Sequence, residues 1–162
     1  MEDLRVQFIH GLEGSPQGSK AQRLARHFDT RTPAMDTSDF EACVVRQAEV
    51  AEAFEPDVLV GSSFGGSVAV ALLMRGLWAG PTLLLAQAAL RHDPAVRLPE
   101  NVTVWIVHGR QDDIVDPDDS RRLAETGSPG RVRLIEVDDD HPLHASVASG
   151  RLVEWVEQLA RG

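Results

Sequence analysis

The chain is 162 residues long, which favours one domain spanning residues 1–162. Its formal net charge of -9 argues against a nucleic-acid-binding surface, and its single cysteine excludes an internal disulfide and a Cys-rich zinc site. The chain starts with acidic rather than basic residues and has no apolar run near the roughly 20 residues of a membrane span, so we expect a soluble, cytoplasmic protein.

Apolar runs alternate with helical patterns along the whole chain, which predicts a mostly parallel sheet with helices on both faces. The fold class expected is therefore α/β, a three-layer α/β/α sandwich with a sheet of about six strands. In such sheets ligands bind at the carboxyl ends of the strands. The predicted strands cover residues 4–9, 30–34, 57–60, 82–86, 102–107 and 132–137, the second of them at an edge because it contains Pro33. The predicted helices cover residues 19–28, 39–54, 64–77, 117–126 and 146–160, and the segment 87–101 could carry a short helix.

A serine motif follows the predicted strand 57–60. Residues 61–65 are Gly-Ser-Ser-Phe-Gly, which matches Gly-x-Ser-x-Gly with Ser63 in the middle. A sharp turn from strand to helix holds such a serine in a strained conformation with its hydroxyl exposed. Ser62 is the alternative, but Val60 would then occupy the first glycine position of the motif. The pattern therefore predicts Ser63 as a nucleophile.

Partners for this serine follow two later strands. A serine hydroxyl needs a base, and the base needs an orienting acid. Residues 108–117, His-Gly-Arg-Gln-Asp-Asp-Ile-Val-Asp-Pro, follow one predicted strand, and residues 138–144, Asp-Asp-Asp-His-Pro-Leu-His, follow the last. The order serine, acid, histidine fits that of hydrolases with this serine motif. Two histidines compete as the base, and His141 follows the strand more directly than His144.

Together these motifs resemble those of the α/β-hydrolase superfamily. The pattern His-Gly-x-x-Asp-x-x-Val at residues 108–115 is similar to the acid-bearing turn of that family, and its register selects Asp112 rather than Asp113. The family often has proline directly after the valine, whereas here Asp116 intervenes. The segment 8–16, Phe-Ile-His-Gly-Leu-Glu-Gly-Ser-Pro, is similar to the oxyanion loop of small bacterial predicted esterases without a cap domain.

The resemblance implies a minimal α/β-hydrolase fold and a Ser63–His141–Asp112 triad. It implies a serine hydrolase that cleaves a carboxylic ester or thioester of a small-molecule acyl substrate, with an oxyanion hole formed by the backbone N–H groups of Leu12 and Phe64. No cofactor and no metal are expected. The alternatives are an amide or peptide hydrolase with the same triad and a non-catalytic binding protein. The sequence leaves the oligomeric state open.

Three other patterns have simpler interpretations. His10 and His108 each precede a glycine at the end of a predicted strand, and we expect them to hold these turns by side-chain hydrogen bonds. The acidic run at residues 112–119 lacks the glycine and glutamate positions of a calcium-binding EF-hand loop. The glycine-rich loop before Lys20 is not a phosphate-binding P-loop, because Ser19 separates the lysine from the last glycine.

Overall fold

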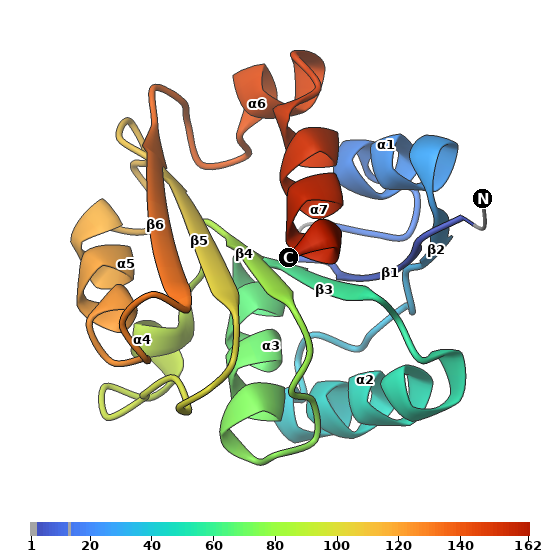
Figure 1. The fold of residues 1–162 in the computed structure, drawn as a ribbon, viewed down its shortest axis with the longest axis horizontal. Coiled ribbons are helices and arrows are strands. Elements are labelled where there is room, and N and C mark those ends of the chain that lie inside the picture. Colours follow the sequence, from blue (N-terminus) through green and yellow to red (C-terminus); the bar gives the residue numbers. More distant parts are fainter. Residues whose placement is uncertain (1–2, 13) are drawn as a thin grey trace.

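Six parallel strands form one sheet at the centre of the computed structural model, which describes residues 3–12 and 14–162 (Figure 1). Their order in the sheet is β2-β1-β3-β4-β5-β6, and every neighbouring pair is parallel. The strands are β1 (Arg5–Ile9), β2 (Asp29–Arg31), β3 (Val58–Ser62), β4 (Thr82–Leu85), β5 (Val104–Gly109) and β6 (Val132–Val137).

Helices cover both faces of the sheet, which confirms the predicted three-layer α/β/α sandwich (Figure 1). Helices α1, α6 and α7 lie on one face, and α2, α3 and α5 lie on the other. The helices are α1 (Ser19–His27), α2 (Phe40–Phe54), α3 (Phe64–Met74), α4 (Ala89–His92), α5 (Pro117–Ala124), α6 (His144–Ala148) and α7 (Arg151–Arg161).

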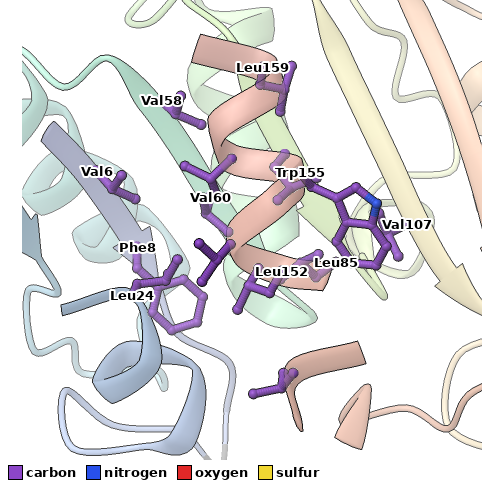
Figure 2. Close-up of a cluster of buried hydrophobic side chains, with 14 of the residues drawn as sticks. Val6, Phe8, Leu24, Val58, Val60, Leu85, Val107, Leu152, Trp155 and Leu159 are labelled. Carbon is purple, nitrogen blue, oxygen red and sulfur yellow. The ribbon is translucent and has the colours of Figure 1, made fainter. Parts of the chain in front are cut away.

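Alternating side chains of the central strands fill two separate hydrophobic cores. In β3, Val58 and Val60 point toward α7, while Leu59 points to the opposite face, as the two-residue period of a strand requires. Figure 2 shows the first core, where Trp155 of α7 lies beside Val107 of β5 and Leu85 of β4. This packing fixes the sheet rigidly, so the loops at its carboxyl edge start from defined positions.

Beyond shifts of two or three residues at element ends, such as α3 ending at Met74 rather than at residue 77, the structure differs from the predicted elements in the last helix and the edge strand. The predicted helix 146–160 is two helices, α6 and α7, because Gly150 between them takes a left-handed conformation with φ of 87°. The edge strand β2 is shorter than predicted and ends at Arg31, so that Pro33, which has no N–H to donate, lies outside the ladder. None of the helices in the described ranges has the length and apolar composition that crossing a bilayer requires.

Candidate active site

Ser63 stands alone between the last residue of β3 and the first residue of α3. Its backbone has φ of 55° and ψ of −115°, a conformation that is strained for a residue with a side chain. The surrounding backbone holds it there, since the Ser63 N–H donates to the Leu85 carbonyl at 2.9 Å and the Ser63 carbonyl accepts from the Gly66 N–H at 2.9 Å. The sequence pattern predicted this sharp turn.

The two motif glycines allow the strand and the helix to meet at this turn. A Cβ atom on Gly65 would lie 2.0 Å from the carbonyl oxygen of Ile9 in β1. A Cβ atom on Gly61 would lie 2.5 Å from the carbonyl oxygen of Gly65. Any side chain at either position would therefore push α3 away from the sheet and move Ser63 with it.

A chain of two hydrogen bonds connects Ser63, His141 and Asp112. The Ser63 Oγ lies 3.0 Å from His141 Nε2, and His141 Nδ1 lies 2.7 Å from Asp112 Oδ2. Because a carboxylate only accepts hydrogen bonds, Nδ1 carries the imidazole proton, which leaves Nε2 to accept from the serine hydroxyl. The three side chains come from the loops after β3, β5 and β6, and the sheet brings them together at its carboxyl edge.

Asp112 and its neighbour Asp113 lie in different environments. Its side chain is fully buried, whereas the neighbouring Asp113 is exposed. The second carboxylate oxygen, Oδ1, accepts from the backbone N–H groups of Ile114 at 2.9 Å and Val115 at 2.8 Å. These two bonds anchor Oδ1, while the other carboxylate oxygen, Oδ2, faces His141.

The competing histidine has a different partner. His144 Nδ1 lies 2.7 Å from Asp140 Oδ2, and the His144 side chain is 74% exposed at the start of α6. This hydrogen bond lowers the pKa of Asp140 to about 2. His144 thus stabilises the turn before α6 and has no contact with Ser63.

A cavity of about 430 Å³ opens beside Ser63 and His141. Leu12 lines this cavity, and the loop that carries it lies against the serine, since a Cβ atom on Gly11 would be 3.4 Å from Ser63 Cβ. Phe64 is the first residue of α3, and an N–H at that position has no intrahelical acceptor. The structure therefore places both predicted oxyanion residues next to Ser63.

Comparison with known proteins places this arrangement in a fold. No protein-family model and no curated protein matches the sequence. Among solved structures, the whole chain aligns with the whole of a candidate hydrolase of the alpha/beta superfamily from Xanthomonas campestris, with a TM-score of 0.80 and 23% identity. The chain has the α/β-hydrolase fold.

A candidate hydrolase from Agrobacterium vitis aligns over 98% of this chain and 88% of its own, with a TM-score of 0.78 and 16% identity. A monoacylglycerol lipase from Paleococcus ferrophilus aligns over 97% of this chain and 94% of its own, with a TM-score of 0.77 and 14% identity.

Two further side chains of this α/β-hydrolase-fold protein face the same cavity. His10 is buried, and its Nδ1 bonds the Gly11 carbonyl at 2.8 Å, as expected for a histidine that holds a turn. Lys20 of α1 also lines the cavity, and burial lowers the pKa of its ammonium group although Asp140 and Asp139 act to raise it. No sequence pattern pointed to Lys20 as a residue of this site, because only the packing of α1 brings it to the cavity.

Two other features lie apart from this site. A second hollow of about 440 Å³ is lined by residues of β2 and α2, among them Arg31, Arg46 and Phe54, and it shares none of these residues with the cavity at Ser63. Across residues 3–12 and 14–162, no three His, Cys, Asp or Glu side chains gather in a way that would hold a metal ion.

Proposed function

We propose that this protein is a serine hydrolase that cleaves carboxylic esters or thioesters of small acyl substrates through an acyl-enzyme. One observation carries the proposal: the Ser63 Oγ lies 3.0 Å from His141 Nε2, and His141 Nδ1 lies 2.7 Å from a buried Asp112 carboxylate. A nucleophile, a base and an orienting acid at these distances are the parts that acyl transfer needs. The cavity beside Ser63 gives an acyl group access to the hydroxyl.

In the first half of the proposed reaction, Ser63 Oγ attacks the acyl carbonyl carbon while His141 Nε2 takes the hydroxyl proton. Asp112 stabilises the imidazolium that forms. The negative charge on the carbonyl oxygen is bound by the backbone N–H groups of Leu12 and Phe64, and each such donor typically contributes roughly 10²- to 10³-fold in rate. The tetrahedral species then collapses: the bond to the leaving group breaks, and the leaving alcohol or thiol takes the proton from His141.

In the second half, water enters and His141 Nε2 removes one of its protons. The resulting hydroxide attacks the acyl carbon, and the bond between this carbon and Ser63 Oγ breaks. The proton on His141 returns to Ser63, and the products are a carboxylic acid and the free enzyme. The same side chains would also cleave an amide substrate, whereas a non-catalytic binding protein would hydrolyse no substrate. Measuring p-nitrophenyl acetate, acyl-thioester and peptide-amide hydrolysis side by side tests the proposal: turnover of esters or thioesters well above amides supports it, and absence of all three contradicts it.

We expect short acyl chains to be preferred. The cavity has about 430 Å³, and Leu12 and Ile114 on its lining are 62% and 53% exposed, so no cap covers its mouth in the described parts of the chain. A long acyl chain would leave much of its apolar surface in water and gain little binding energy. kcat/KM for p-nitrophenyl esters should therefore peak at short chains. A strong preference for chains of lauroyl length or longer would contradict this prediction.

The two histidines give a matched pair of variants. His141→Ala should lower kcat/KM for p-nitrophenyl acetate by roughly 10⁴- to 10⁶-fold, because no base is left for the Ser63 hydroxyl. His144→Ala should keep the activity and change the free energy of unfolding by less than about 1 kcal/mol, since an exposed ion pair contributes little. Initial rates and thermal unfolding of both variants check this. Loss of activity in the His144 variant alone would move the base to that residue.

A further inference from the structure

A second buried chain of polar side chains reaches Asp112 without passing through His141. Gln87 follows β4, His108 lies in β5 and Ser120 lies in α5, and each of the three is 0% exposed. Gln87 Nε2 lies 3.1 Å from Ser120 Oγ, and Ser120 Oγ lies 2.6 Å from His108 Nδ1. His108 Nε2 lies 3.1 Å from Asp112 Oδ2 and 2.9 Å from the Val115 carbonyl oxygen. The proposed hydrolysis uses none of Gln87, Ser120 and His108 directly.

The chemistry of the end groups fixes the direction of these hydrogen bonds. A carbonyl only accepts, so His108 Nε2 carries a proton and donates it to the Val115 carbonyl, while Asp112 Oδ2 lies 3.1 Å from the same nitrogen. In the neutral ring Nδ1 is then an acceptor, and the Ser120 hydroxyl donates to it. The amide nitrogen of Gln87 in turn donates to the Ser120 oxygen. This second chain of hydrogen bonds therefore ends on Val115, whose own N–H donates to Asp112 Oδ1.

The two chains meet on one atom. Oδ2 of Asp112 lies 2.7 Å from His141 Nδ1 and 3.1 Å from His108 Nε2, while Oδ1 accepts from two backbone N–H groups. Asp112 thus accepts three hydrogen bonds, one on Oδ2 and two on Oδ1, and His108 Nε2 lies against the same Oδ2. A buried carboxylate needs such polar partners to remain charged without water.

The far end of the second chain returns to the turn that carries Ser63. The Gln87 Oε1 accepts from the Ala89 N–H at 2.8 Å, and the Ala88 N–H donates to the Ser63 carbonyl at 3.2 Å. Gln87 also packs closely on α3, since a Cβ atom on Gly66 would lie 2.7 Å from Gln87 Cβ. The polar contacts thus form a closed ring from the Ser63 hydroxyl, through both histidines, back to the Ser63 backbone.

From this ring we infer that His108 is a positioning residue for the proposed hydrolysis: its Nε2–H holds the Val115 peptide, and through it the Asp112 carboxylate, in the orientation that directs His141 Nε2 at Ser63. The inference rests on the proposed function. Without this donor, the Val115 carbonyl loses its partner, and the turn whose N–H groups hold Asp112 Oδ1 can shift. His141 would then lose its alignment with Ser63, although every group that reacts is still present.

Two conservative substitutions separate the donor at the place of His108 Nε2 from the remainder of the ring. In His108→Gln, the amide nitrogen reaches the place of Nε2 and keeps a donor for the Val115 carbonyl beside Asp112. In His108→Asn, the amide reaches only the place of Nδ1, which keeps a partner for Ser120 and removes the donor to Val115. Ser120→Ala is the control, because it cuts the ring on the other side of His108 and leaves the contact with Asp112 in place.

We expect kcat for p-nitrophenyl acetate to fall on the order of 10- to 100-fold in His108→Asn with KM little changed, since the turn that holds the charged Asp112 loses a buried hydrogen bond. The Gln variant should recover most of this loss, and Ser120→Ala should lower the melting temperature but leave kcat within a few-fold of the wild type. A purely structural His108 would give losses of kcat that follow melting temperature across all three variants. Equal kcat in the Asn and Gln variants would overturn the inference.

Nuclear magnetic resonance of ¹⁵N-histidine-labelled protein gives a readout that does not depend on activity. In the wild type, the His108 ring should carry its proton on Nε2, and the His141 Nδ1–H should give a downfield, exchange-protected resonance. This resonance should persist in His108→Gln and be lost or shifted upfield in His108→Asn. A His108 ring that carries its proton on Nδ1 in the wild type would overturn the inference. This measurement does not depend on whether a variant folds. A wild type that shows these resonances but hydrolyses no ester would instead contradict the proposed function.

Discussion

Ser63→Ala is expected to lower kcat/KM for p-nitrophenyl acetate by roughly 10⁵- to 10⁶-fold, because the substitution removes the nucleophile and with it the acyl-enzyme. The fold should survive the change, since the Ser63 backbone makes the contacts that hold the turn and the hydroxyl bonds only His141 among the described residues. Initial rates with the ester, together with circular dichroism of the variant, measure both effects.

Ser62→Ala is the control for this substitution. Ser62 is the last residue of β3, and its side chain has no contact with His141. The control should keep most of its kcat, with any change in KM reflecting its place on the cavity wall. If Ser63→Ala keeps the activity and Ser62→Ala loses it, the nucleophile is Ser62.

The second large effect is expected at Asp112. Asp112→Asn should lower kcat by roughly 10⁴-fold, because an amide that donates to His141 Nδ1 favours the wrong imidazole tautomer and leaves Nε2 protonated. KM should change little, since Asp112 is buried behind His141 and does not line the cavity. Steady-state kinetics with p-nitrophenyl acetate separate the two constants.

Asp113→Asn removes the same charge at the adjacent, exposed position. It should leave kcat close to that of the wild type, because only Asp112 contacts His141. Similar losses of kcat in both variants would show that the local negative charge matters rather than the hydrogen bond to His141, and would contradict the role given to Asp112.

The candidate residues Ser63, Asp112 and His141 could be proposed from the sequence because the signals for them are local. In parallel α/β sheets the residues that follow the strands gather at one edge, so short motifs after three strands predicted that Ser63, Asp112 and His141 would meet. The glycines at positions 61 and 65 indicated that backbone segments lie close together at the turn that carries Ser63. The spacing of apolar residues, with the periods typical of strands and of helices, predicted most of the secondary-structure elements.

The features that the sequence did not reveal depend on contacts between distant segments. Gln87 and Ser120 are 33 residues apart and had no motif around them, so nothing pointed to their hydrogen bond or to the ring that it completes. His108 was expected to hold a turn, and it does bond the Val115 carbonyl, but its contact with Asp112 appears only in three dimensions. The break between α6 and α7 did have a local signal in Gly150, which the apolar period of the flanking residues obscured.

The most direct test of the account is covalent labelling with a fluorophosphonate, which reacts with an activated serine and leaves a phosphonyl adduct. The folded wild-type protein should gain the mass of one adduct, and peptide mapping should place it on Ser63. Prior heat unfolding should abolish the labelling, because activation of the hydroxyl depends on the hydrogen bond with His141. An adduct on Ser63 would support a serine hydrolase, while a folded protein that takes up no label, or takes it up on another residue, would contradict the account.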